Sequence, residues 1–427
     1  MAAYMILSAF RARRRMIAAL ALAVAASLAH AQPLTFTPFR ESGIYGLGEK
    51  AGWTVTIAKD APAANYTYVI KKNNSETIRT GALDLSSGAA TIEATLNEPA
   101  MLYVEAGLAE RPAIHLGAAI APAQLQPSVP RPADFDSFWD AKLKALAEVP
   151  INPVLTANTN AAPGVECYTV RLDSLGSHVQ GYLAKPAREG KFPALVVFQY
   201  AGVYALQTKT ITDRAEEGWL AFDVDSHDMP PDKAEGVSRN YQAIGNTDRE
   251  SSYFLNMYLR DSRAIDYIAR RPDWDGRTIV VTGTSMGGQQ SLVTAALNPK
   301  VTAVIVNEPS GADSNGDLHG RRAGYPNWPS DNPKVMETAL YFDTVNFAPR
   351  IKAPVLAALG FIDTIAPPVG IWIALDRIPG PKEVIPMVES DHNNITPEKQ
   401  EAYHSRSKEV LGIIFNGGEF KPKALPE

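Results

Sequence analysis

The stretch that decides the fold is Ile279–Gly288, which reads IVVTGTSMGG and leads into the helix-forming run Gln289–Leu297. The apolar, β-branched start predicts a buried strand, and the chain must then turn sharply into a helix with a serine at the apex. Only glycines, which flank this serine at two positions' distance, permit so tight an elbow. The pattern predicts Ser285 as an exposed nucleophile, with the N–H of Met286 aimed at a developing oxyanion.

The surrounding sequence places this elbow in a parallel sheet. From about residue 165, apolar runs alternate with helical segments such as Phe254–Ile268, which ends before Pro272. The other apolar runs are Ala194–Phe198, Leu220–Val224, Ala303–Val306 and Val355–Leu359. The alternation predicts a doubly wound, mostly parallel sheet with helices on both faces, where chemistry gathers at the carboxyl ends of the strands. A plain Gly-rich turn is the alternative for the elbow, and it leaves the partners described next unexplained.

A general base can be sought by elimination, because α/β-hydrolases place the acid and then the histidine after the nucleophile in chain order. The histidines that follow Ser285 are His319, His392 and His404. His404 falls in an expected C-terminal helix over residues 398–415, where a solvated histidine is ordinary. His319 precedes the strand expected to carry the acid, so its order is wrong. His392 directly follows the strand-like run Glu383–Val388 and is the predicted base.

The acid is predicted to be Asp363, which follows the buried run Pro354–Gly360. A carboxylate buried at a strand end can orient the imidazole and stabilise its charged form. Asp391 is the competitor, but its adjacency to His392 makes the required geometry awkward. The expected catalytic set is therefore Ser285, His392 and Asp363.

A second oxyanion donor is expected in the loop after Ala194–Phe198. The backbone N–H of Tyr200 is the candidate and Ala201 is the register alternative, while aromatic packing alone is the other interpretation. His227 ends another strand-like run and is a candidate for the substrate pocket, although a solvated loop histidine fits the sequence equally well.

Composition limits the remaining functions. The 427-residue chain has a formal net charge of -5 and no basic run beyond its extreme N-terminus, so no nucleic-acid partner is expected. Cys167 is the single cysteine, which excludes an internal disulfide and a thiol-pair redox centre, and its alternating context favours a buried structural thiol over a nucleophile. Asp225, His227 and Asp228 suggest a metal site, but close neighbours at a strand end point in divergent directions. We predict neither a metal nor a cofactor.

The N-terminus reads as an export signal. Arginines at 11 and 13–15 precede the apolar run Met16–Leu28 and the small-residue segment Ala29–Ala31. This run is shorter than the ~20 residues of a membrane-spanning helix, so residues 1–31 are predicted to be a signal peptide cleaved after Ala31. The general secretory and twin-arginine routes both remain open. The mature protein is expected in the periplasm or outside the cell, with no membrane span.

The mature chain divides into two parts. Residues 33–125 contain short alternating runs such as Trp53–Ile57 and Met101–Val104, separated by turn residues, and predict a small all-β sandwich. A Pro-rich linker follows at residues 126–133. The hydrolase domain is expected over residues 134–420, and Asp134 is expected to cap its first helix.

The hydrolase part resembles the acetyl xylan esterase and cephalosporin C deacetylase family over about residues 130–415. The resemblance rests on the first helix Asp134–Trp139 (DFDSFW), the helix Tyr258–Tyr267 (YLRDSRAIDY) and the acid loop Asp363–Pro368 (DTIAPP). It implies Ser285, Asp363 and His392 as the triad, and Tyr200 with Met286 as oxyanion donors.

The sequence departs from the family pattern at three places. The family elbow usually reads Gly-Gly-Ser-Gln-Gly-Gly, where Thr284 and Met286 stand here; Asp225–His227 replaces the usual Arg-Gly-Gln; and Asn393, not Glu, follows the histidine. Because a backbone N–H does not depend on the side chain, these changes concern substrate specificity more than the hydrolase chemistry.

The expected function is therefore a serine carboxylesterase that removes acetyl groups from carbohydrate esters such as xylan, through an acyl-enzyme. One rival is a peptidase or general esterase on the same fold, and another is a glycan-binding protein with an inert hydrolase domain. The natural ester, the role of the β-sandwich and the oligomeric state do not follow from the sequence.

Overall fold

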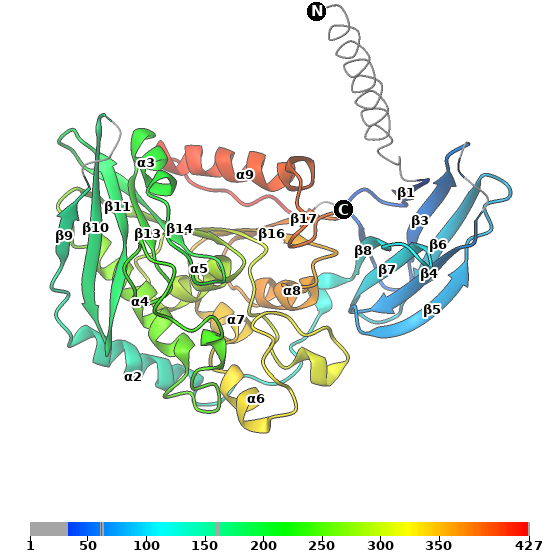
Figure 1. Cartoon of the computed structure of the whole chain (residues 1–427), viewed down its shortest axis with the longest axis horizontal. Helices are drawn as coiled ribbons and strands as arrows, with labels where there is room; N and C mark the ends of the chain where they lie inside the picture. Colours follow the sequence, from blue (N-terminus) through cyan, green and yellow to red (C-terminus); the bar gives the residue numbers. More distant parts are fainter. Residues whose placement is uncertain (1–32, 60, 62–63, 159–162, 426–427) are drawn as a thin grey trace, which may run out of the picture.

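The computed structural model describes residues 33–59, 61, 64–158 and 163–425. It consists of a small all-β part and a larger α/β part that lie side by side (Figure 1). The predicted signal peptide falls on residues 1–31, outside the described residues. Within the described ranges, no helix has the length and apolar character needed to cross a membrane.

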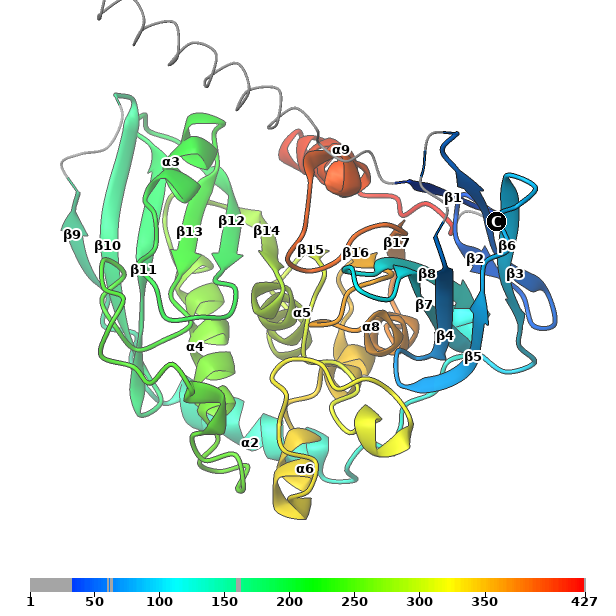
Figure 2. The ribbon, with the colours of Figure 1, turned by 45° about the vertical axis from the view of Figure 1, so that its right-hand side comes forward.

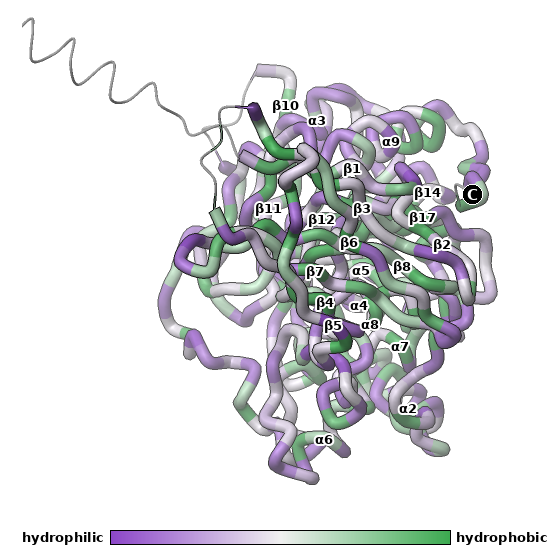
Figure 3. Tube along the Cα trace, turned by 90° about the vertical axis from the view of Figure 1, so that its right-hand side faces the viewer, coloured by the Kyte–Doolittle hydropathy of each residue, from purple (hydrophilic) through white to green (hydrophobic). Residues whose placement is uncertain are grey.

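The N-terminal part is a two-sheet sandwich. One sheet has the strand order β1-β3-β6 and the other β2-β8-β7-β4-β5. The strands are β1 (Leu34–Pro38), β2 (Ile44–Tyr45), β3 (Lys50–Ile57), β4 (Tyr66–Lys72), β5 (Glu76–Ala82), β6 (Ala89–Thr95), β7 (Ala100–Leu108) and β8 (Ile114–Ile120). Apolar and polar residues alternate along several of them (Figure 3), and the inward set, including Leu102, Val104 and Ile120, forms the sandwich core.

The α/β part is built on one nine-stranded sheet with the order β17-β16-β15-β14-β12-β13-β11-β10-β9. Its strands are β9 (Val154–Ala157), β10 (Val165–Ser174), β11 (Ser177–Pro186), β12 (Phe192–Phe198), β13 (Leu220–Val224), β14 (Trp274–Thr284), β15 (Ala303–Asn307), β16 (Val355–Gly360) and β17 (Lys382–Met387). The strands from β12 onward pair in parallel, whereas β9 to β11 are antiparallel. The predicted mostly parallel sheet is confirmed.

Helices cover both faces of this sheet (Figure 1). The α-helices of the described residues are α2 (Phe135–Ala147), α3 (Lys209–Glu216), α4 (Tyr253–Ile268), α5 (Met286–Leu297), α6 (Pro333–Ala339), α7 (Thr344–Phe347), α8 (Pro368–Asp376) and α9 (Pro397–Phe415), with 3-10 turns η1 (Pro122–Gln124), η2 (Tyr241–Ala243), η3 (Gly316–His319) and η4 (Ala348–Arg350). Helices α3 and α9 pack on one face, and the others contribute to the larger core on the opposite face. The carboxyl ends of the parallel strands therefore meet between two helical layers.

The two parts share a packed interface (Figure 2). Met101 on β7 and Ala119 on β8 belong to the same buried cluster as Phe361 in the loop after β16. At Gly117 on β8, an added Cβ would lie 2.6 Å from the Cβ of Phe361 and 2.7 Å from its carbonyl oxygen. The outer face of the β7–β8 pair therefore lies directly against the loop that carries Asp363.

The expected cap of α2 is wrong in its detail. Asp134 occupies the N-cap position, but its side chain makes no capping hydrogen bond. Its carboxylate instead accepts hydrogen bonds from Tyr341 and from Arg249. Tertiary partners supply stronger, charge-assisted donors than the backbone N–H groups of the first turn, so the carboxylate turns outward.

Candidate active site

The strand β14 turns into α5 at Ser285, which has φ 57° and ψ -123°. This is a strained conformation for a residue with a Cβ. The glycines on either side make this turn possible. A Cβ added to Gly283 would lie 2.4 Å from the backbone of Gly287, and a Cβ added to Gly287 would lie 2.2 Å from the carbonyl oxygen of Phe198. Close backbone contacts therefore require glycine at both positions. The expectation that Ser285 is exposed is wrong: the residue is buried, with 6% of its surface accessible, because His392 and the end of β15 pack against it.

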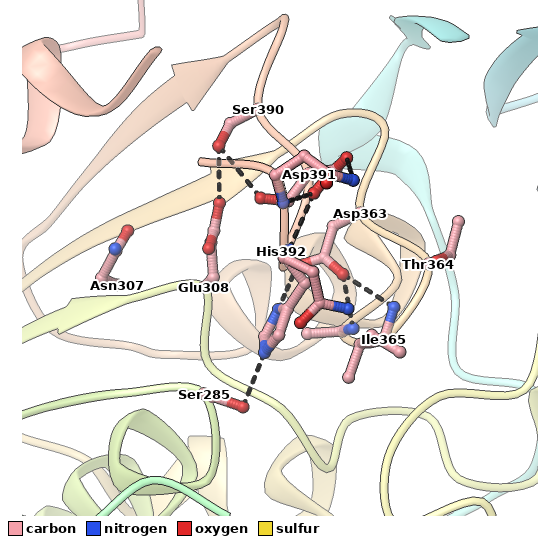
Figure 4. Close-up of polar contacts among 12 residues, drawn as sticks. Ser285, Asn307, Glu308, Asp363, Thr364, Ile365, Ser390, Asp391 and His392 are labelled. Carbon is pink, nitrogen blue, oxygen red and sulfur yellow. Dashed lines mark hydrogen bonds and ion pairs between the residues drawn. The ribbon is translucent and has the colours of Figure 1, made fainter. Parts of the chain in front are cut away.

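The structure brings Ser285, His392 and Asp363 together from three strand ends (Figure 4). The Oγ of Ser285 lies 2.8 Å from Nε2 of His392, and Nδ1 of His392 lies 2.7 Å from Oδ2 of Asp363. Because an ionised carboxylate only accepts hydrogen bonds, Nδ1 carries the proton and Nε2 is free to accept one from the serine. This is the geometry of a nucleophile, a general base and an orienting acid.

Backbone groups fix the acid in place. The Oδ1 of Asp363 accepts hydrogen bonds from the N–H groups of Ile365 (2.8 Å) and Ala366 (2.7 Å). Asp363 is only 1% exposed. Its second oxygen is therefore held toward His392 without competition from water.

The electrostatic surroundings favour a protonated base. Burial lowers the pKa of His392, but the hydrogen bond and charge of Asp363, with the charges of Glu308 and Asp391, outweigh it and raise the pKa above the ordinary 6.5. A negatively charged pocket stabilises the imidazolium that forms when the base takes a proton.

The other candidates for the catalytic set lie elsewhere. Asp391 accepts hydrogen bonds from the backbone N–H groups of Asn393 and Asn394, so its carboxylate closes its own turn and does not face the imidazole. His319 ends the 3-10 turn η3, and His404 lies exposed on α9. Cys167 is buried in β10, where burial raises the pKa of its thiol and disfavours the nucleophilic thiolate.

The two expected oxyanion donors lie at the ends of neighbouring strands. Met286 is the first residue of α5, so its N–H has no carbonyl partner from a preceding helical turn. Tyr200 follows β12, which pairs with β14 up to Phe198 and Gly283. Tyr200 is 56% exposed, and its ring stacks on that of Tyr204 with the ring centroids 4.5 Å apart.

The loop after β12 is held by a group of buried and half-buried polar side chains. The N–H of Gly202 donates to Oη of Tyr241 (3.3 Å), which lies 2.7 Å from Oη of Tyr325. Both tyrosines also contact the sulfur of Met286. This cluster joins the segments that carry the two expected oxyanion donors. The sequence pattern did not reveal it, because the tyrosines lie far from the elbow in the chain.

His227 completes this cluster. It is 0% exposed, and its ring nitrogens lie 2.7 Å from Oη of Tyr253 and 2.9 Å from the carbonyl oxygen of Gly202. Burial lowers its pKa to about 4, so the imidazole is neutral. Sequence reasoning proposed it for the substrate pocket; the structure places it behind the loop, with both nitrogens occupied by the protein itself.

Two clusters of carboxylates and histidines are candidates for metal binding. The carboxylate of Asp225 accepts from the N–H of His227, whereas that of Asp228 accepts from His178 and Gln180, so the two carboxylates have different partners. Among the described residues, Glu308, Asp363 and His392 bring ligand atoms within 4.8 Å of one another. A metal there would have to displace the proton that Nδ1 of His392 donates to Asp363, so these residues fit a catalytic triad better than a metal centre.

Glu308 is the acidic residue at this site that sequence reasoning missed. It follows β15 directly, is 2% exposed, and its carboxylate accepts hydrogen bonds from Ser390 and Gln400. The available signal was a lone glutamate at the carboxyl end of a buried strand.

Comparisons with known proteins show the family to which this chain belongs. The sequence profile of the acetyl xylan esterase family matches residues 123–315 and 325–408. The acetyl esterase Axe7A of Xylanibacter ruminicola is 31% identical over 369 residues, covering 81% of this chain and 83% of that protein.

Solved structures with the same fold include acetyl xylan esterases from Paenibacillus sp. R4 and Thermoanaerobacterium sp. JW/SL YS485. They have TM-scores of 0.60 and 0.57 and 24% identity each; they cover 70% and 69% of this chain, and 98% and 96% of their own. The α/β-hydrolase fold is therefore confirmed. By its sequence, this chain belongs to the acetyl xylan esterase family and is a carboxylic ester hydrolase.

Proposed function

We propose that the protein removes acetyl groups from carbohydrate esters, with xylan or xylo-oligosaccharides as the substrate class, through Ser285, His392 and Asp363. The observation that carries the proposal is the continuous chain of hydrogen bonds from Ser285 through His392 to Asp363. The acetyl esters are proposed from the family and from the name of the relative Axe7A.

The first half of the reaction forms an acyl-enzyme. Nε2 of His392 takes the proton from Ser285 as Oγ attacks the acetyl carbonyl carbon. The backbone N–H groups of Met286 and Tyr200 receive the resulting oxyanion. The carbon–oxygen bond to the sugar then breaks, and His392 returns the proton to the departing sugar oxygen.

The second half regenerates the serine. Water attacks the acetyl-serine while His392 takes one of its protons. The tetrahedral intermediate then collapses to acetic acid as that proton passes to Oγ of Ser285, and the acid ionises to acetate in solution. Throughout the cycle, Asp363 holds the imidazole in the tautomer with the proton on Nδ1.

The place of action belongs to the same proposal. We propose that residues 1–31 act as a signal peptide and direct the enzyme to the periplasm or the cell exterior. A fusion of residues 1–40 to a reporter enzyme that is active only after export tests this, with a fusion that begins at residue 32 as the control.

The experiment that tests the activity is acetate release by the mature protein from acetylated xylan and from p-nitrophenyl acetate. Ser285→Ala is the control. Release from both substrates that disappears in Ser285→Ala supports the proposal. Release from the small ester alone moves the substrate to another class of ester, and undiminished activity of Ser285→Ala rejects the nucleophile.

A further inference from the structure

The buried residue Glu308 lies on a segment tied to the nucleophile. Its own N–H donates to the carbonyl oxygen of Ala358 on β16 at 2.8 Å. On one side, the carbonyl oxygen of Asn307 accepts from the N–H of Ser285 (3.0 Å); on the other, the N–H of Ser310 donates to the carbonyl oxygen of Ser285 (3.1 Å). Glu308 has a positive φ of 45°, so the backbone is held in a strained turn beside the elbow.

The side chain of Glu308 reaches the segment that carries the base (Figure 4). Its Oε1 accepts hydrogen bonds from Oγ of Ser390 at 3.0 Å and from Nε2 of Gln400 on α9 at 3.1 Å. Ser390 stands two residues before His392. The carboxylate of Glu308 can reach Ser390 only because residue 360, at the end of β16, is a glycine. A Cβ added to Gly360 would lie 2.9 Å from Oε1 of Glu308. One carboxylate thus links the nucleophile segment to the base segment.

The same carboxylate adds charge to the site. A ligand atom of Glu308 lies within 4.8 Å of one on Asp363 and one on His392. Burial and the charge of Asp363 raise the pKa of Glu308 to about 7, while Ser390, His392 and Gln400 act in the opposite direction. In return, Glu308 is one of the groups that raise the pKa of His392, together with Asp363 and Asp391. The titratable groups that face Glu308 are therefore Asp363 and His392, with Asp391 next to the base.

A Ser-His-Asp mechanism by itself uses no atom of Glu308. A buried carboxyl group is costly, so its presence beside the triad calls for a role. We infer that Glu308 is a positioning residue that holds the turn bearing His392 through Ser390 and places a second negative charge beside the imidazole. This inference rests on the proposed triad.

Two variants separate the two parts of this role. Glu308→Gln retains an oxygen that accepts from Ser390 and Gln400 but removes the charge. Loss of a nearby opposite charge disfavours the imidazolium, so the acid limb of the kcat/KM–pH profile should move down. Because Glu308, with a pKa of about 7, is only partly ionised along this limb, the movement should be a fraction of a pH unit. Ser390→Ala retains the charge but removes one hydrogen bond. Because His392 is still present and only its positioning is weakened, kcat should fall roughly 10-fold, less than the ~10²–10⁴-fold that positioned proton transfer contributes in full, with a smaller movement of the limb. In the native protein, this limb belongs to the coupled pair Glu308 and His392.

Controls distinguish positioning from general damage. Glu401→Gln removes an exposed carboxylate next to Gln400 on α9 and should leave the profile unchanged. Near-UV circular dichroism and Tm establish that each variant is folded. An acid limb that does not move in folded Glu308→Gln overturns the inference, whatever happens to kcat. Retained activity in Ser285→Ala would instead reject the triad itself, so the two failures give different results.

Discussion

The Nε2–H of His227 donates a hydrogen bond to the carbonyl oxygen of Gly202 at 2.9 Å. A carbonyl oxygen only accepts, so this nitrogen carries the proton and Nδ1 accepts from the hydroxyl of Tyr253. The bond holds the loop that follows Tyr200, where φ of Gly202 is 130°. We expect His227→Ala to lower kcat roughly 10- to 100-fold with little change in KM, because complete loss of an oxyanion donor costs ~10²–10³.

The measurement is steady-state hydrolysis of p-nitrophenyl acetate. His404→Ala, at an exposed position on α9, is the control and should behave as the native enzyme. A native kcat in His227→Ala would show that the loop keeps its geometry without the imidazole.

His227 also makes stability depend on pH. Its folded-state pKa of about 4 lies below the ordinary 6.5, so unfolding takes up a proton between these values. The contribution of the neutral imidazole is fully present above about pH 6.5 and is lost as the pH falls toward 4. Between these limits, Tm should therefore fall less steeply in His227→Gln than in the native protein. Parallel Tm–pH curves would contradict this.

Asp363 and Asp391 provide a matched pair at the base. Asp363→Asn should reduce kcat by roughly 10³- to 10⁴-fold, because an amide at this position can stabilise the wrong tautomer of His392. Asp391→Asn removes a carboxylate that closes its own turn, so kcat should fall less than 10-fold. Comparison of kcat at the pH optimum checks both, and equal losses would argue that the acid has been wrongly chosen.

The raised pKa of His392 predicts the acid limb of activity. The base must be neutral to accept the proton of Ser285, so kcat/KM falls as the pH drops through the pKa of His392. Because this pKa lies above 6.5, the midpoint of the limb in the free enzyme should also lie above 6.5. A profile of kcat/KM from pH 5 to 9 measures it, and a midpoint below 6.5 would contradict the electrostatics of the site.

The contact between the β-sandwich and the acid loop can be tested at Gly117. Gly117→Val places side-chain atoms where the backbone of Phe361 lies, so both Tm and kcat should fall, the latter at least several-fold. Gly46→Ala is the control in the same sandwich, because its added Cβ makes only ordinary contacts with Glu49. A folded Gly117→Val protein with native kcat would show that Asp363 does not depend on this interface.

Local sterics explain why the elbow could be predicted. The glycines beside Ser285 are required by backbone contacts within a few residues, and the strand before it is marked by its own apolar run. Asp363 and His392 followed from chain order and strand ends, and the structure brings both to the serine. Each of these features can be predicted from a short segment of the sequence.

Other features depend on contacts between distant segments. Glu308 meets Ser390 only because β15, β16 and β17 pair in a particular register. The carboxylate of Asp134 accepts hydrogen bonds from Arg249 and Tyr341 and not from the N–H groups of the helix end. No local sequence pattern predicts those partners. The tyrosines around Met286 likewise come from separate loops. Tertiary geometry decides each of these cases.

The packing of β7 and β8 on the loop at Phe361 has a practical consequence for engineering. A carbohydrate-binding appendage on a flexible tether can be cut off or exchanged, but here a shortened enzyme that begins near residue 123 would expose the apolar surface beneath Met101, Ala119 and Gly117 to water. The loop that carries Asp363 would then lose the strands that pack against it at Phe361. Minimal versions of this hydrolase should therefore retain the sandwich, or redesign the surface beneath it.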